Sequence, residues 1–82
     1  MIIYRVKVNV ITDAGESTIY NEEHTTWGMA SNDLEEVQNT IREAMSKNLT
    51  TFGKWKHPYI EILGSFLMVD KIRAINTTIV EC

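Results

Sequence analysis

Catalysis and metal binding need particular side chains at particular intervals, and this 82-residue chain offers few of them. Its two histidines, His24 and His57, are far apart in the sequence. Glu22 and Glu23 precede His24, but the group does not complete a metal-ligand pattern. No motif pairs a nucleophile with its base or forms a phosphate-binding glycine loop. We therefore expect a protein without enzymatic activity, bound metal or cofactor.

The charged side chains are more informative, because acids and bases separate along the sequence. The net charge is −3, yet all 8 lysines and arginines lie outside the segment from Val8 to Ile41, which holds seven acids. A surface of one charge attracts a partner of the opposite charge and raises its association rate. We expect these acids to form one continuous surface that binds a basic patch on a partner protein, such as one that handles nucleic acid. The alternative is an ordinary solvated surface. The predicted partner-binding residues are Glu22, Glu23, Trp27, Asp33, Glu35 and Glu36.

A second candidate is the segment 52–59, in which lysines alternate with aromatic residues. Single-stranded nucleic acid is bound by such surfaces, because cations contact phosphates while rings stack on bases. Tryptophan and tyrosine equally favour protein binding, and a simpler alternative is that Phe52 and Trp55 pack over the end of a helix. The net negative charge disfavours phosphate binding, so we expect a protein partner ahead of nucleic acid. The alternative nucleic-acid-binding residues are Lys54, Trp55, Lys56 and Tyr59.

The N-terminal half predicts a β-hairpin followed by a helix. Residues 2–11 alternate apolar and polar positions, and residues 17–27 form the return strand after a glycine turn. The helix is expected to begin at the capping residue Asn32, with Glu35 at its third position and acids in its first turn. Trp27, just before the helix, either anchors a partner or packs as a contact that holds the helix entry.

The C-terminal half predicts short strands. Residues 59–63 and 66–69 are strands around a glycine turn, and residues 77–80 form a last strand. Residues 70–75 fit either a continued strand or one helical turn. The expected fold is one α+β domain over residues 1–82, in ββαββ order, with four to five strands in an antiparallel or mixed sheet and one amphipathic helix on one face. The uncovered face or an edge strand makes a structural homo-oligomer a further alternative.

The expected location is the cytoplasm, without membrane association. The N-terminus lacks the uninterrupted apolar core of a signal peptide, and no apolar run is long enough to span a bilayer. The single cysteine, Cys82, excludes an internal disulfide, and its position at the chain end suggests no particular role.

The segment 31–76 resembles small proteins of unassigned function from phages and prophages of Gram-positive bacteria. The resemblance rests on an acid-capped helix, an aromatic loop and the hydrophobic-Asp-x-Ile pattern of Val69-Asp70-Lys71-Ile72. It implies an accessory protein, such as a phage-encoded inhibitor, that binds a host or phage macromolecule in the host cytoplasm. It implies no catalytic residues.

Overall fold

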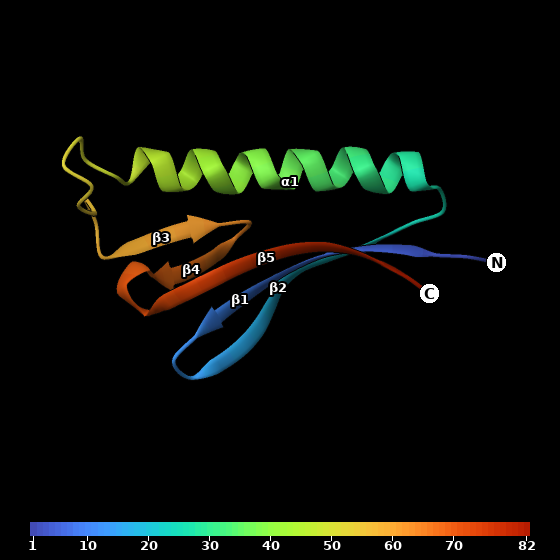
Figure 1. Ribbon diagram of the computed structural model, residues 1–82, viewed down its shortest axis with the longest axis horizontal. Coiled ribbons are helices and arrows are strands. Elements are labelled where there is room, and N and C mark those ends of the chain that lie inside the picture. Colours follow the sequence, from blue (N-terminus) through green and yellow to red (C-terminus); the bar gives the residue numbers. More distant parts are fainter.

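One long helix and five strands make up the computed structural model, which describes all 82 residues (Figure 1). The strands form two antiparallel sheets, one of three strands and one of two. The α+β class, the single long helix and the count of up to five strands are therefore confirmed. The order is ββαβββ and not ββαββ, and the strands form two sheets where one was predicted. In chain order the elements are β1 (Tyr4–Thr12), β2 (Gly15–His24), α1 (Trp27–Lys47), β3 (Tyr59–Ile62), β4 (Ser65–Met68), the short 3-10 helix η1 (Val69–Lys71) and β5 (Ile72–Glu81).

The three-stranded sheet has β1 at its centre, between β2 and β5. The alternation predicted for β1 is present, because Val6, Val8 and Val10 are almost fully buried while the residues between them are not. The register of β1 with β2 shifts once beside Val8, which leaves Ile19 as the extra residue of a β-bulge. β2 ends at His24, three residues before the predicted end of the return strand.

The helix α1 begins at Trp27, several residues earlier than predicted. Thr26 is the N-cap, and its Oγ1 accepts a hydrogen bond from the Met29 N–H at 3.2 Å. The predicted cap Asn32 lies inside the helix, because the turn before it is helical and contains the fully buried Ala30. No acid lies in the first turn, so the expected favourable interaction of acids with the helix N-terminus is absent.

The second sheet is the hairpin of β3 and β4, whose turn lies one residue earlier than predicted. Ile62 pairs with Ser65, so Leu63 and Gly64 form a two-residue turn. Both have positive φ, 51° and 81°, as a type I′ turn requires. The half-buried side chain of Leu63 packs against the hydrophobic core, which stabilises a conformation that leucine otherwise disfavours.

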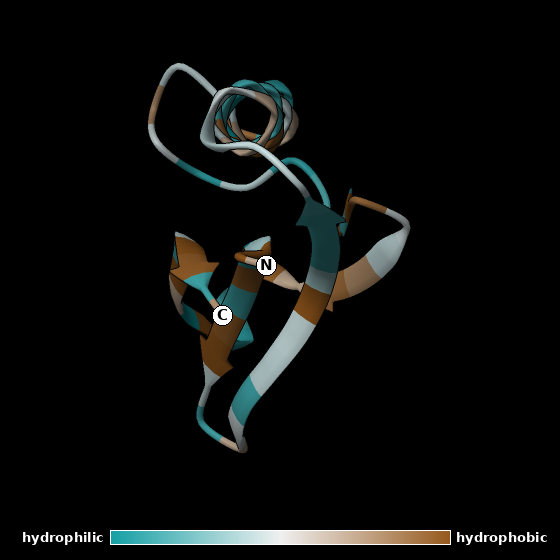
Figure 2. Cartoon of the chain, turned by 90° about the vertical axis from the view of Figure 1, so that its right-hand side faces the viewer, coloured by the Kyte–Doolittle hydropathy of each residue, from teal (hydrophilic) through white to brown (hydrophobic).

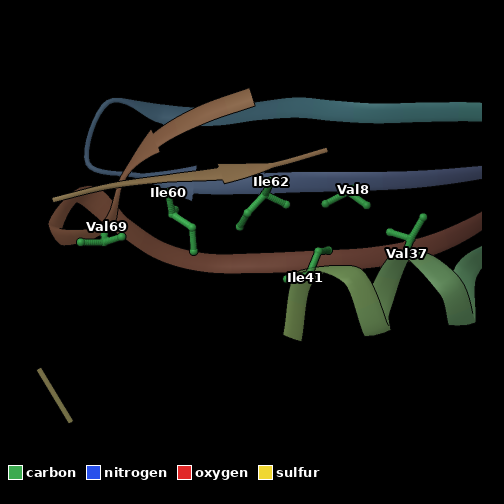
Figure 3. Close-up of a cluster of buried hydrophobic side chains, with 6 residues drawn as sticks. All are labelled: Val8, Val37, Ile41, Ile60, Ile62 and Val69. Carbon is green, nitrogen blue, oxygen red and sulfur yellow. The ribbon is translucent and has the colours of Figure 1, made fainter. Parts of the chain in front are cut away.

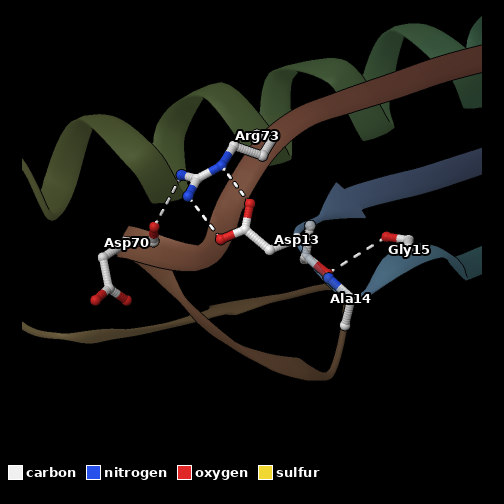
Figure 4. A network of polar contacts seen from close by, with 6 residues as sticks. Asp13, Ala14, Gly15, Asp70 and Arg73 are labelled. Carbon is white, nitrogen blue, oxygen red and sulfur yellow. Dashed lines mark hydrogen bonds and ion pairs between the residues drawn. The ribbon is translucent and has the colours of Figure 1, made fainter.

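Residues 70–75, for which two alternatives were open, combine both, because the single turn of η1 leads directly into β5. Arg73 fixes this junction (Figure 4). Its Nε and Nη2 donate to the two carboxylate oxygens of Asp13 at 2.8 and 2.7 Å, and its Nη1 donates to the Asp70 carbonyl oxygen at 3.1 Å. The start of β5 is thereby tied to the turn between β1 and β2.

The hydrophobic core lies between one face of the three-stranded sheet, the helix and the hairpin (Figure 3). Seen along its axis, α1 lies to one side of the strands (Figure 2). The core is small, since 10 of the 82 residues are buried and the molecule measures 47 × 26 × 17 Å. Neither helix is both long and apolar enough to cross a membrane. The central cluster comprises Val8, Val37, Ile41, Ile60, Ile62 and Val69.

Candidate partner-binding site

A pocket of about 330 Å³ lies between β2 and the N-terminal half of α1. The strand contributes Tyr20, Glu22 and His24, which share one face because alternate residues of a strand point the same way. We call this pocket the acidic pocket, because three of its 7 lining residues are carboxylates. The helix residues that line it are Met29, Asn32, Asp33 and Glu36.

Asp33 is the centre of a hydrogen-bond network in the acidic pocket. The Tyr20 hydroxyl donates to Asp33 Oδ1 at 2.8 Å and lies 3.0 Å from Oδ2. His24 Nε2 lies 2.8 Å from Asp33 Oδ2. The side chains of His24 and Asp33 are 19% and 15% exposed, so the network is largely sheltered from solvent. Two partners from β2 therefore hold the Asp33 carboxylate in one position.

The pKa of Tyr20 records the negative charge of the acidic pocket. Burial is the largest of the effects that raise this pKa to about 12, and the hydrogen bond to Asp33 comes next. The negative charges of Asp33, Glu22 and Glu36 act in the same direction. Tyr20 thus remains a neutral hydrogen-bond donor at neutral pH, and the same negative potential favours a cation in the pocket.

The predicted acids are divided between different faces of the molecule. Glu23 forms an ion pair with Arg5 on the uncovered sheet face, and Asp13 forms one with Arg73. Glu35 is exposed on α1 outside the pocket. The acids therefore do not form the one continuous surface expected from the sequence. The predicted residues that the structure brings together are Glu22, Asp33 and Glu36.

Trp27 packs against β1 at the start of the helix and still exposes much of its surface. Its ring packs edge-to-face against Tyr4, with ring centroids 5.8 Å apart at 76°, yet the residue is 59% exposed. Tyr4 is the register partner of His24, which lines the acidic pocket. Met29, also exposed, lines the pocket itself. A negative pocket with an apolar rim suits the head and stem of a long basic side chain.

Tyr20 and His24 line the acidic pocket, although neither is among the predicted partner-binding residues. The available signal was strand parity, because both residues lie an even number of positions from Glu22. The missing information was the position of Asp33, which lies within hydrogen-bond distance of both only after α1 packs beside β2.

The basic–aromatic loop 52–59 is anchored to the end of α1 by Asn48, the one buried polar residue. Its Nδ2 donates to the His57 carbonyl oxygen at 3.1 Å, and its Oδ1 accepts from the His57 N–H at 3.0 Å. The Lys56 N–H donates to the Asn48 carbonyl oxygen at 2.7 Å. These bonds close the chain between Asn48 and His57 into a loop of fixed width.

The side chains of this loop are too exposed for the alternative in which Phe52 and Trp55 pack together over the end of the helix. Phe52 is 90% exposed, so it does not cover the core. Lys54 and Lys56 are exposed and belong to none of the ion pairs of the molecule. Trp55 is partly covered and forms a single β-bridge with Leu49. Tyr59 lines a separate groove of about 430 Å³ between α1 and β3.

No cluster of three or more His, Cys, Asp or Glu side chains is arranged to hold a metal ion. Cys82 is an exposed free thiol. Comparisons with protein-family models, with curated proteins and with solved structures found no match. Function is therefore inferred from the geometry of the acidic pocket and of the loop.

Proposed function

We propose that this protein is a non-enzymatic binding protein whose acidic pocket receives a lysine or arginine side chain of a partner protein. The main observation behind the proposal is that one of the three carboxylates is held by hydrogen bonds while the other two belong to no ion pair. Asp33 is held by two hydrogen-bond partners. Glu22 and Glu36 belong to none of the four ion pairs of the molecule, so their charges are available to a ligand.

A cation in this pocket gains more than a cation at an ordinary surface. The three carboxylates of this open pocket repel one another, and a positive charge between them relieves that repulsion. A guanidinium group can also donate two parallel hydrogen bonds to one carboxylate, which adds geometric specificity. Asp33 is already fixed in position, so binding orders one side chain fewer.

The surroundings of the pocket favour a protein partner over a small cation. Met29 lines the pocket and is exposed, and Trp27, two positions earlier in the chain, is exposed as well. Exposed tryptophan is typical of the residues that dominate interface energetics. The partner class that we propose is a protein with a basic patch, including one that normally binds nucleic acid. Occupying such a patch would inhibit that partner, which is the proposed accessory role.

The test is a titration of the ¹⁵N-labelled protein with a tetra-arginine peptide, followed by amide chemical shifts. We expect the largest shifts at Glu22, Asp33 and Glu36. The double variant Glu22→Lys with Glu36→Lys is expected to bind the peptide about tenfold more weakly, because it places two cations beside the binding position.

The matched control is the double variant Glu16→Lys with Glu61→Lys, which has the same net charge but changes two exposed residues outside the pocket. We expect it to retain nearly all of the peptide affinity at 150 mM salt, where distant charges are screened. Equal weakening by both double variants would show that only net charge matters and would refute the proposal.

A second candidate function is binding of single-stranded nucleic acid by the loop 52–59. The full exposure of Phe52 and the unpaired state of Lys54 and Lys56 favour it. The test uses Trp27→Phe, which leaves Trp55 as the only tryptophan. Quenching of its fluorescence by a dT oligonucleotide would support this function if the binding weakens steeply as the salt concentration rises. Unchanged fluorescence at low salt would exclude it.

A further inference from the structure

The two edges of the three-stranded sheet differ in how well they are protected against pairing with a strand of another molecule. The β2 edge carries Glu16, Glu22 and Glu23 and is bent by the bulge at Ile19, both of which discourage pairing with another strand. β5 has a run of seven residues without charge, proline or glycine, from Ala74 to Val80. Five of the seven are β-branched residues that favour strand pairing, namely Ile75, Thr77, Thr78, Ile79 and Val80.

The hydrogen-bond pattern identifies which backbone groups of β5 lack a strand partner. Ile3 and Cys82 exchange two backbone hydrogen bonds, of 3.2 and 2.9 Å. Hydrogen-bonded pairs alternate along an antiparallel ladder. From Cys82 back to Ala74, the backbone N–H and C=O groups of the even-numbered residues therefore point toward β1. The N–H and C=O groups of the odd-numbered residues face away, where no further strand follows. These outward residues are Ile75, Thr77, Ile79 and Glu81.

We propose that a second copy of this chain occupies this edge, with the two β5 strands antiparallel and Thr77 opposite Thr77 of the second copy. The register satisfies the outward backbone groups of Ile75, Thr77 and Ile79 on both strands. It places Ile75 opposite Ile79 of the second copy, an apolar pair, on the face that carries the helix.

An open groove with polar and apolar lining residues lies beside this edge. A groove of about 300 Å³ runs between α1 and β5, and Gln38, Arg42 and Ile75 are among the residues that line it. Gln38 Nε2 donates to Thr77 Oγ1 at 2.9 Å, which fixes the groove wall next to the edge. Ile79 of the second copy would enter this groove and extend the small hydrophobic core across the twofold axis.

The resulting dimer has one continuous six-stranded sheet. The twofold axis is perpendicular to the sheet at Thr77, so both helices lie on the same face. The two β2 strands become the outer edges, about 24 Å apart at about 4.8 Å per strand. The protected edges thus remain exposed while the unprotected edges pair, and the dimer carries two acidic pockets on one face. The dimer does not depend on the function proposed for those pockets.

The first test replaces Thr77 by proline and measures molar mass by sedimentation equilibrium over a range of concentrations. The wild-type protein is expected to reach twice the chain mass of 9.4 kDa. Thr77→Pro removes an N–H that faces away from β1, so the ladder within one chain is retained while the dimer is lost. Asn21→Pro is the matched control, because Asn21 has the same outward position on the β2 edge, and it is expected to dimerise like wild type.

The second test identifies the edge directly and does not depend on proline. In a Cys82→Ser background, Thr77→Cys is expected to form an intermolecular disulfide under mild oxidation, since the two Thr77 residues face each other. Asn21→Cys in the same background is expected to remain monomeric on a non-reducing gel. A wild-type protein that stays monomeric at millimolar concentration would overturn the proposal, as would a dimer that survives in a folded Thr77→Pro variant.

Discussion

Tyr20 and Asp33 come from different elements, and their contact determines how the protein responds to alkali. The pKa of Tyr20 is raised to about 12, above the ordinary value of 10.0 that we take for the unfolded chain. The folded state therefore holds this proton more tightly, so its contribution to stability is complete below pH 10 and is lost as pH rises through 12. Ionisation of Tyr20 thus removes its hydrogen bond to Asp33 and destabilises the folded state.

Tyr20→Phe tests this linkage. At pH 7 the variant is expected to be less stable by about 1 kcal/mol, because a hydrogen bond to the Asp33 carboxylate is lost. Between pH 10 and pH 12 the difference in unfolding free energy from wild type should shrink, since only the wild-type protein then loses the Tyr20 contribution. Urea unfolding at several pH values measures this. A difference that stays constant up to pH 12 would contradict the raised pKa.

Asn48 illustrates a structural role that its position in the sequence does not reveal. Both of its side-chain groups bond the backbone of His57, so Asn48→Ala leaves a donor and an acceptor without their partner. We expect the free energy of unfolding to fall by about 2 kcal/mol, together with a large shift of the His57 amide signal. Asn39→Ala, which changes an exposed asparagine of the same helix, should alter stability by less than about 0.5 kcal/mol.

The start of α1 can be tested by comparing two possible caps. Thr26→Ala removes the oxygen that accepts from the Met29 N–H and is expected to cost about 1 kcal/mol. Asn32→Ala should instead be neutral or slightly stabilising, because alanine has the higher helix propensity at an exposed interior position. Thermal unfolding followed by circular dichroism measures both. A larger loss for Asn32→Ala would mean that the helix begins where the sequence predicted.

Local sequence patterns predicted whether a segment is a helix or a strand more reliably than they predicted the residues at which it begins and ends. The alternation of β1 and the apolar spacing around Val37 and Ile41 are set by burial on one face, and both predictions hold. Capping residues occur before Trp27 and again before Leu34, and only tertiary packing of the first turns selects between them. The turn at Leu63 was missed because leucine is unusual at a positive φ and its stabilising contact with the core is non-local.

The candidate site depended on tertiary structure still more strongly. Glu22 and Glu23 are neighbours in sequence, but strand parity sends one to the acidic pocket and the other to Arg5. The rule that adjacent strand residues point to opposite faces needs only the sequence, and it places Glu22 and Glu23 on different faces of the sheet. The position of Asp33 beside β2 could not be predicted in this way, because it depends on the packing of the helix against the sheet.

The arrangement of strands in the molecule also predicts how hydrogen exchange is distributed. β1 is bonded on both sides, so its amides should exchange slowest, whereas β5 should show an alternating pattern. The amides of Asn76 and Thr78 face β1 and are protected, while those of Ile75, Thr77 and Ile79 face the free edge and exchange rapidly in dilute protein.

Exchange measured at increasing protein concentration separates the edge geometry from the proposed dimer. The alternating pattern in dilute protein depends only on the ladder between β1 and β5, and uniform protection along β5 under those conditions would contradict that ladder. Selective protection of the Ile75, Thr77 and Ile79 amides at high concentration is expected if the β5 edges pair, because these N–H groups then donate to the second copy. In Thr77→Pro the amides of Ile75 and Ile79 should remain unprotected at every concentration, while those of Asn76 and Thr78 stay protected by β1.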